Sequence, residues 1–363
     1  MQLGIIGLAR SGKTTIFNAV TRGSAAVGGY SEQPNVGVVT VPDPRVDRLA
    51  ELYKPKKTTY ATIQYVDFPA AGQAFGKGEG PAGKFINDLG RMDALIHVVR
   101  MFQDDTVPHP ETTIDPDRDI ATMDLELTFA DLAMIERRLQ RMETELRSMK
   151  AGERDALQRT KDLLERIKSQ LEAEVPIRAQ SISEDEWKLL EGTQFLTARP
   201  LLIVLNIGDG DLPRRMEIEA EMRPKHQGPK RDIAVFSGKF EMELNELSDE
   251  EAAEFRAEAG VTESGMAEAI RLSYALLGLI SFLTAGHDEC RAWTVAAGSP
   301  APVAAGKIHT DLQRGFIRAE VVSFDDLVAS GSEAEAKKKG LVRTEGKQYI
   351  VHDGDVINIL FNV

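Results

Sequence analysis

The segment GLARSGKTT at residues 7–15 carries the clearest chemical signature in the chain. It fits the pattern G-x-x-x-x-G-K-[ST] and follows an apolar run directly. Glycines let such a loop curl, so that its backbone N–H groups point at phosphate oxygens. Lys13 would reach the β- and γ-phosphates, and the Thr14 hydroxyl suits Mg²⁺, which prefers hard oxygen ligands. The loop predicts a nucleotide site, and the alternative is a chance match in a glycine turn.

A second strand is expected to supply a carboxylate beside the metal. The stretch TIQYVDF at 62–68 alternates apolar residues and reaches Asp67, which we predict to lie near Mg²⁺. The glycine-rich stretch at 69–85 lacks apolar periodicity. It is either a loop that reports the state of the γ-phosphate or a long connection with no switching role.

The base of the nucleotide should be read at the end of a later strand. The apolar run in RPLLIVLNIGDGD, at 199–211, closes on Asn206 and Asp209 with the spacing N-x-x-D. A carboxylate at Asp209 could accept from two guanine donors, whereas adenine offers only its 6-amino group on that edge, so this residue alone favours GTP. Ser237, Gly238 and Lys239 resemble the turn that supports the base in GTPases, although three-residue motifs are common.

The elements around these motifs predict an α/β fold with inserted and appended parts. The stretch DALIHVVRMF at 93–102 indicates another buried strand. Between 123 and 150, apolar residues recur at helical spacing; they are Leu125, Phe129, Leu132, Ile135, Leu139, Met142, Leu146 and Met149. A turn near Gly152 and a second periodic run predict an antiparallel helical hairpin. After LGLISFLTAG the pattern changes to short strands and turns, which predicts a separate binding module.

Composition restricts the classes of function. The formal net charge of −13 and the pI near 5.1 argue against a protein that coats nucleic acid non-specifically. The single cysteine, Cys290, excludes an intramolecular disulfide and a cysteine zinc cluster. No stretch of about 18 apolar residues and no secretory leader stands out, so we expect a soluble, cytoplasmic protein that does not bind membranes.

With these motifs in place, the chain resembles the YchF or Obg-like ATPase family of P-loop proteins. The resemblance includes PNVGVVTVPDPRVDRL at 34–49, GKGEG at 76–80, DALIHVVR at 93–100 and RAWTVAAG at 291–298. It implies a P-loop G domain, an inserted antiparallel coiled-coil arm and a C-terminal β-grasp TGS domain. The expected boundaries are G domain at 1–120, arm at 121–197, G domain again at 198–278 and TGS domain at 279–363. The family prefers ATP to GTP and is associated with ribosomes, translation and stress responses.

The resemblance also assigns roles to particular residues. The residues expected to bind the nucleotide are Arg10, Ser11, Gly12, Lys13, Thr14, Thr15, Asn206, Ile207 and Asp209. The residues expected at the metal are Thr14, Ser31 and Asp67. Asp209 stands where the family usually has glutamate, which leaves the choice between ATP and GTP open. Ala71 stands where ordinary GTPases have glutamine, so His109 is the candidate for orienting water; the alternative is an exposed loop histidine.

Three functions remain compatible with the sequence. The first is a Mg²⁺-dependent ATP hydrolase in which Lys13 neutralises charge and His109 positions water. The second is a GTPase. The third is a nucleotide-gated adaptor with little hydrolysis, which Ala70 and Ala71 favour because neither can do the work of the usual glycine and glutamine. Expected partners are the ribosome, through its large subunit, or RNA, and the chain is expected to be a monomer or a nucleotide-dependent dimer.

Overall fold

The computed structural model describes residues 1–25, 34–69, 81–148, 154–261 and 263–362. These residues form two compact units. The first unit consists of Met1–Gly37 and Gln64–Leu272, and the second of Val38–Ile63 and Ser273–Val363. The chain therefore leaves the first unit, contributes a short segment to the second and then returns.

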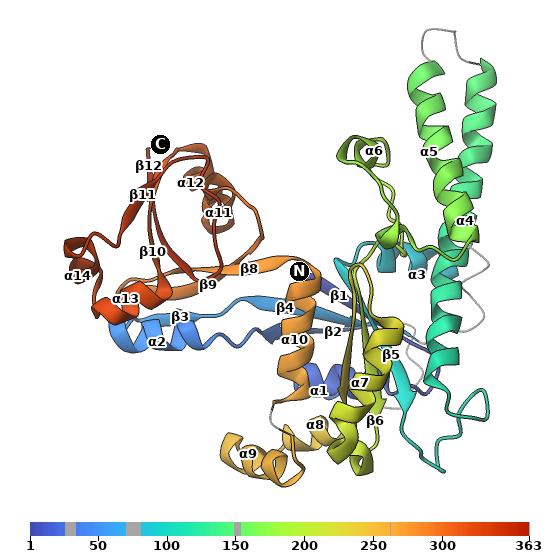
Figure 1. Ribbon diagram of the computed structural model, residues 1–363, viewed down its shortest axis with the longest axis horizontal. Helices are drawn as coiled ribbons and strands as arrows, with labels where there is room; N and C mark the ends of the chain where they lie inside the picture. The colour runs from blue at the N-terminus through green and yellow to red at the C-terminus, as the bar shows by residue number, and fades with distance from the viewer. Residues whose placement is uncertain (26–33, 70–80, 149–153, 262, 363) are drawn as a thin grey trace. The chain divides into compact units, whose positions relative to one another are not determined.

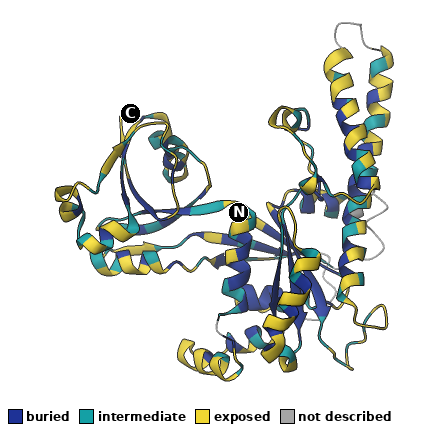
Figure 2. Ribbon diagram, viewed as in Figure 1, coloured by how far each residue is buried: buried dark blue, intermediate teal, exposed yellow. Residues whose placement is uncertain are grey.

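A six-stranded sheet forms the centre of the first unit, in the order β2-β4-β1-β5-β6-β7. The pairings of β1 with β4 and β5, of β5 with β6 and of β6 with β7 are all parallel. Its strands are β1 (Gln2–Ile6), β2 (Asn35–Thr40), β4 (Thr62–Asp67), β5 (Ala94–Met101), β6 (Leu201–Ile207) and β7 (Arg231–Phe236). The central strands are almost wholly buried (Figure 2), as near-continuous apolar runs in a parallel sheet require. The predicted α/β fold is confirmed.

Helices connect or follow the strands of the first unit, because parallel strands need crossover connections. They are α1 (Lys13–Thr21), α3 (Pro81–Gly90), η4 (Asp209–Arg214), α7 (Arg215–His226), α8 (Gly238–Leu244), α9 (Asp249–Glu258) and α10 (Gly265–Leu276), the last of which runs across the unit boundary. One face of the sheet buries side chains of β5 and β6, including Leu95, Val99, Ile203 and Leu205, in a single apolar cluster. Burial of this kind, at about 25 cal/mol per Å² of apolar surface, is what holds the strand ends in fixed positions.

The predicted arm is present as a helical hairpin between β5 and β6 (Figure 1). It consists of α4 (Pro116–Ser148) and α5 (Arg154–Glu172), and is followed by η3 (Ile177–Ala179) and α6 (Glu184–Leu189). Ile135, Met142, Leu164 and Ile167 are buried together between the two helices. The hairpin thus buries one apolar stripe from each helix, as the period of the sequence predicts.

The first part of the predicted stripe is wrong. Leu125 is 41% exposed and Phe129 is 53% exposed, whereas Met123 and Leu127 are buried against the core of the first unit. The physical reason is that α4 has two partners along its length, the sheet near its start and α5 farther on, and it turns a different face to each. A single stripe drawn through both halves cannot describe such a helix.

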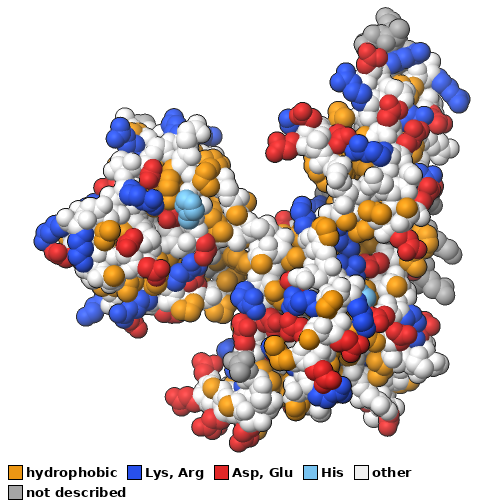
Figure 3. Space-filling view, viewed as in Figure 1, with side chains coloured by type: hydrophobic (Ala, Val, Ile, Leu, Met, Phe, Trp, Pro, Cys, Tyr) orange, Lys and Arg blue, Asp and Glu red, His pale blue; other side chains and the backbone are white. Residues whose placement is uncertain are grey.

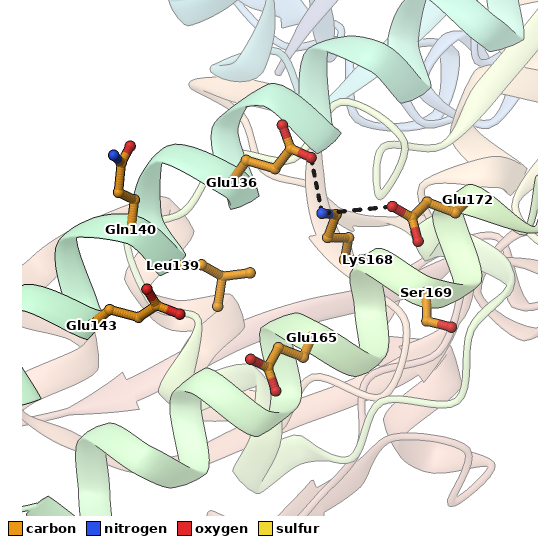
Figure 4. Close-up of a pocket in the computed structure, with 8 residues that line it drawn as sticks. All are labelled: Glu136, Leu139, Gln140, Glu143, Glu165, Lys168, Ser169 and Glu172. Atoms are coloured by element: carbon orange, nitrogen blue, oxygen red, sulfur yellow. Dashed lines mark ion pairs between the residues drawn. The ribbon is translucent and has the colours of Figure 1, made fainter.

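Charged side chains cover the outside of the arm, with both signs interspersed (Figure 3). A groove of about 440 Å³ runs between α4 and α5, and Lys168 lies in it, paired with Glu136 at 2.9 Å and with Glu172 at 3.6 Å (Figure 4). Pairs this exposed contribute little to stability, about 0–1 kcal/mol each. Their main effect is to keep the arm solvated.

The base of the arm is fixed by a buried carboxylate. Asp131 of α4 accepts hydrogen bonds from the backbone N–H groups of Leu196 and Thr197, at 2.9 and 2.8 Å, and from the Thr197 hydroxyl at 2.7 Å. Burial raises the pKa of Asp131 to about 6, although these three hydrogen bonds act in the opposite direction. The hairpin is therefore anchored next to β6 by a fully buried carboxyl group.

A mixed six-stranded sheet forms the second unit, in the order β11-β10-β12-β8-β9-β3. Its strands are β3 (Lys57–Thr59), β8 (Leu279–Thr284), β9 (Glu289–Ala296), β10 (Phe316–Ser323), β11 (Arg343–Glu345) and β12 (Asp355–Phe361). Its helices are α2 (Pro44–Tyr53), α11 (Ala301–Ile308), α12 (Thr310–Arg314), α13 (Phe324–Ser330) and α14 (Glu333–Lys338). The strands predicted after LGLISFLTAG belong to this sheet, but β8 lies inside that stretch and β3 comes from much earlier in the chain.

One segment of the second unit comes from the N-terminal third of the chain. Val46 and Leu49 of α2 are fully buried in the same cluster as Leu283 and Cys290, and β3 pairs in parallel with β9. The predicted boundaries assign residues 38–63 to the G domain, whereas here they group with residues 273–362, although β2 and β4 at the two ends of this segment belong to the first sheet. Within the described residues, no helix combines the length and the apolar character needed to cross a bilayer.

Candidate nucleotide-binding site

The phosphate loop lies between the end of β1 and the start of α1. Gly7 and Gly12 both have positive φ, at 154° and 88°, and a side chain at Gly12 would collide with the Asn206 amide. Glycine is therefore required at position 12 both for its backbone conformation and for space. Gly12 is also the N-cap of α1, so the loop leads directly into a helix N-terminus that favours anions.

Lys13 is held inside this loop. Its Nζ donates to the carbonyl oxygens of Gly7 and Leu8, each at 2.9 Å. Burial lowers the pKa of Lys13 to about 8, and the nearby Asp67 carboxylate partly offsets that effect. A buried ammonium that donates to carbonyl groups is a place where a polyphosphate would be stabilised, because the added negative charge compensates for the desolvation of the lysine.

Asp67 lies at the end of β4, opposite the start of α1. Its Oδ2 accepts from the Thr14 hydroxyl at 2.9 Å and from Asn35 Nδ2 at 3.3 Å. Its Oδ1 is buried and has no hydrogen-bond partner in the part of the chain that the structure describes. Burial raises the pKa of Asp67, against the effects of Thr14, Asn35 and Lys13.

These groups fit a hard divalent cation. A carboxylate oxygen without a partner among the described residues and a hydroxyl that contacts the same carboxylate are the hard oxygen ligands that Mg²⁺ prefers when it is also bound to phosphate. The predicted metal ligands Thr14 and Asp67 are thus in contact with each other. Ser31 lies outside the described residues, as do Ala70 and Ala71.

Sequence reasoning missed Asn35. The asparagine begins β2, next to the segment that contains Ser31, and it reaches the Asp67 carboxylate across 32 positions of sequence. The local signal was its place in PNVGVV, a stretch that indicates family resemblance and carries no obvious chemistry.

The N-x-x-D pair lies at the end of β6, beside the phosphate loop. Asn206 Nδ2 donates to the Ser11 carbonyl at 3.1 Å, and Asn206 Oδ1 accepts from the Gly238 N–H at 3.0 Å. Asn206 is only 3% exposed. It therefore connects the phosphate loop to the turn that follows β7, and both of its polar atoms are used in doing so.

Asp209 is held by that same turn. Its Oδ1 accepts from the Ser237 hydroxyl at 2.6 Å, and Lys239 Nζ lies 3.8 Å from its Oδ2. Ser237 also caps α8 by accepting from the Phe240 N–H. The carboxylate is thus fixed in orientation at the carboxyl edge of the sheet, where ligands of open α/β sheets bind.

The remaining predicted residues differ in how the structure places them. Arg10 has a left-handed φ of 61°, and its guanidinium donates to the Pro108 carbonyl at 3.0 Å. Ser11 is buried, and Thr15 is half-buried in the first turn of α1. Ile207 belongs to the apolar core beneath the sheet, so its side chain faces other core residues. A role for Ile207 at the base stays a prediction.

His109 is connected to the phosphate loop only through its neighbour Pro108, whose carbonyl accepts the hydrogen bond from Arg10. The histidine side chain is buried, which differs from the exposed loop histidine considered as the alternative. Its ring Nε2 lies 3.0 Å from Asp119 Oδ2, and its Nδ1 accepts from the Glu111 N–H at 3.1 Å. Asp119, in the first turn of α4, is a second residue that the sequence did not single out.

The site combines three features: a phosphate loop that leads from a buried strand into a helix, a carboxylate and hydroxyl pair beside the loop, and an N-x-x-D pair at the end of the next strand but one. Together these features define a P-loop nucleoside triphosphatase of the G-domain type. Comparisons with known proteins make this more specific. The chain is 41% identical over 365 residues to the ribosome-binding ATPase YchF of Bacillus subtilis (strain 168), with 99% of each chain covered. It is 38% identical over 363 residues to the protein of that name from Escherichia coli O157:H7, again with 99% of each covered.

A solved structure and a family model agree with these relatives. The structure of the Schizosaccharomyces pombe YchF GTPase matches with a TM-score of 0.83 and 29% identity, covering 99% of this chain and 97% of that one. The family model YchF-GTPase_C, described as a protein of unknown function (DUF933), matches residues 279–362. The chain belongs to the YchF family, and the resemblance inferred from its motifs is confirmed.

Proposed function

We propose that this chain is a Mg²⁺-dependent ATPase that binds ribosomes and acts in the cytoplasm. The observation that carries the proposal is the contact between Thr14 and Asp67 beside the buried Lys13. Lys13 would neutralise charge on the β- and γ-phosphates, and the loop N–H groups would hold their oxygens. Mg²⁺, when bound, would add further charge neutralisation, with Thr14 and Asp67 as its ligands and Ser31 as a third candidate.

The preference for ATP is supported by the names of the bacterial relatives, which are ribosome-binding ATPases. A GTPase is the second candidate, because Asp209 offers the carboxylate that guanine would use and Ser237 fixes it in place. The Schizosaccharomyces pombe relative, which is named a YchF GTPase, favours this second candidate as well. An adaptor with little hydrolysis is the third candidate, and it rests on Ala70 and Ala71 alone.

In the proposed reaction, His109 positions the attacking water. A neutral imidazole with a free lone pair can accept a hydrogen bond from water and hold it in line with the γ-phosphorus. The ribosome is the proposed partner, by analogy with the relatives' names, and a nucleotide-dependent dimer or a monomer is the proposed state of the chain. The proposed contact is with the large ribosomal subunit or with RNA.

Competitive binding of ATP and GTP with Mg²⁺, followed by steady-state turnover, tests the proposal. We expect turnover of ATP that disappears in Lys13→Ala and falls at least about tenfold in His109→Ala, as is typical for loss of a positioned proton-accepting group. Tight binding without turnover would identify the adaptor instead, and a preference for GTP that Asp209→Glu reverses would identify the GTPase. Co-sedimentation with ribosomes on a sucrose gradient, with and without nucleotide, tests the partner.

A further inference from the structure

The tautomer of His109 follows from its two neighbours. The Glu111 N–H is only a donor, so Nδ1, 3.1 Å away, must accept and carries a lone pair. The ring proton of the neutral imidazole is therefore on Nε2, which donates to Asp119 Oδ2 at 3.0 Å. Both ring nitrogens are engaged, and the His109 side chain is only 5% exposed.

In this position His109 cannot orient water. The lone pair on Nδ1 is occupied by Glu111, and Nε2 has no lone pair because it bears the proton. For the ring to accept from a water molecule, at least one of these two hydrogen bonds must break. The ring is therefore inactive in the proposed reaction as long as both nitrogens are engaged in this way. We call this arrangement the stored position of His109.

Asp119 is suited to hold the ring and to release it. Its side chain is 4% exposed, and its Oδ1 accepts from Arg118 Nε at 3.0 Å and from Arg118 Nη2 at 2.8 Å. Because Arg118 stays paired with the carboxylate, departure of the histidine does not leave a buried charge without compensation. Arg118 also donates to the Thr113 carbonyl at 2.8 Å, so it fixes the end of the same loop.

Arg10 connects this loop to the phosphate loop. Its Nη1 donates to the carbonyl of Pro108, the residue next to His109. An arginine can bind phosphate oxygens through two parallel hydrogen bonds to an anionic acceptor, whereas the Pro108 carbonyl is a single neutral acceptor. A polyphosphate in the loop would thus compete for the same guanidinium and remove a tether one residue from the histidine.

We propose that Asp119 is a positioning residue that stores His109 in the Nε2–H tautomer, and that capture of a triphosphate by Arg10 loosens this loop and frees the ring. The inference rests on the proposed role of His109 in hydrolysis. According to this inference, the first turn of α4 controls the position of His109 and therefore the reaction, in addition to supporting the arm.

The tautomer is tested by NMR of the ring nitrogens in full-length protein labelled with ¹⁵N-histidine. The chain has six histidines, and the signals of His109 are those lost in His109→Gln. Without nucleotide we expect a protonated Nε2 and an unprotonated Nδ1, both of which change when a non-hydrolysable ATP analogue and Mg²⁺ are added. A protonated Nδ1, or signals that the analogue leaves unchanged, refutes the stored position.

Turnover of ATP tests the consequence. In Asp119→Asn a neutral acceptor replaces the carboxylate, so we expect the rate at saturating ATP to rise about fivefold, the difference between a charged and a neutral hydrogen bond. The matched control is Asp117→Asn, which removes another histidine and aspartate pair of the same helix turn, with His226 at 2.6 Å, and should leave the rate within about twofold of wild type. The double variant Asp119→Asn/His109→Gln should lose the gain.

The outcomes separate this inference from the proposed function. A wild-type rate in His109→Gln refutes the proposed role of His109 and with it the inference. A slow His109→Gln together with an unchanged or slower Asp119→Asn refutes the inference alone, because Asp119 would then support the active position. In Arg10→Gln the analogue should bind without changing the His109 signals; a full change there would refute the part assigned to Arg10.

Discussion

Replacing Asn206 by alanine tests whether this residue reads the base or supports the site. Asn206 uses both polar atoms within the protein, on the Ser11 carbonyl and the Gly238 N–H. The substitution leaves two buried backbone groups without these partners, at about 1–3 kcal/mol each. Taking the lower end of the sum, about 2 kcal/mol, we expect about 30-fold weaker nucleotide binding.

We expect the Asn206→Ala protein to lose affinity for ATP and for GTP by the same factor, because the substitution disturbs the phosphate loop and not the recognition of the base. The assay is equilibrium binding of non-hydrolysable ATP and GTP analogues in the presence of Mg²⁺. The matched control is Asn245→Ala, in which a carboxamide that donates to the Ala19 carbonyl at 2.8 Å is removed from the same unit. That variant should bind both analogues as the wild type does.

The reasoning is refuted if Asn206→Ala changes the ratio of the two affinities by more than about threefold, a difference of about 0.65 kcal/mol, since that would mean that the residue discriminates between bases. It is also refuted if both affinities stay at their wild-type values, since the two internal hydrogen bonds would then contribute nothing to the shape of the loop.

Two further predictions concern the metal and the arm. Asn35→Ala removes a hydrogen bond to the Asp67 carboxylate, so we expect the Mg²⁺ concentration needed for half-maximal nucleotide binding to rise about fivefold. Nucleotide binding in EDTA should not change. An equal loss of binding in EDTA would contradict this prediction. For Asp131, the folded pKa of about 6 lies above the unfolded value of 3.8, so stability at the base of the arm is highest below pH 4 and falls as the pH rises through 6. Between pH 5 and pH 7 we expect a loss of about 1 kcal/mol in the opening free energy of the Leu196 and Thr197 amides, measured by hydrogen exchange corrected for intrinsic rates. The slope should vanish in Asp131→Asn, and a slope of the opposite sign would contradict the assignment.

Much of the site could be predicted because its residues belong to local patterns. The phosphate loop, Asp67 and the N-x-x-D pair each follow a buried strand, and the carboxyl ends of parallel strands meet at one edge of the sheet. Periodicity likewise predicted the arm, since two stripes at helical spacing were separated by a turn.

Residues that act through tertiary contacts could not be predicted in this way. Asn35 reaches Asp67 across 32 positions, and Asp119 meets His109 only because the loop after β5 folds back on the start of α4. The exposed Leu125 shows the same limit for packing, because periodicity does not say which partner each half of a long helix will face. The placement of residues 38–63 depends on a core that is completed more than 200 positions later.

That last feature has a practical consequence for dissecting the protein. A fragment ending at residue 278 would retain Val46 and Leu49 but lack Leu283 and Cys290, which complete their cluster, and β3 would lose β9 as its neighbour. Such a fragment would expose a half-built apolar surface and tend to aggregate, even with its phosphate loop intact. A workable truncation must therefore also excise residues 41–61, which lie between β2 and β4, and rejoin the cut ends with a short linker.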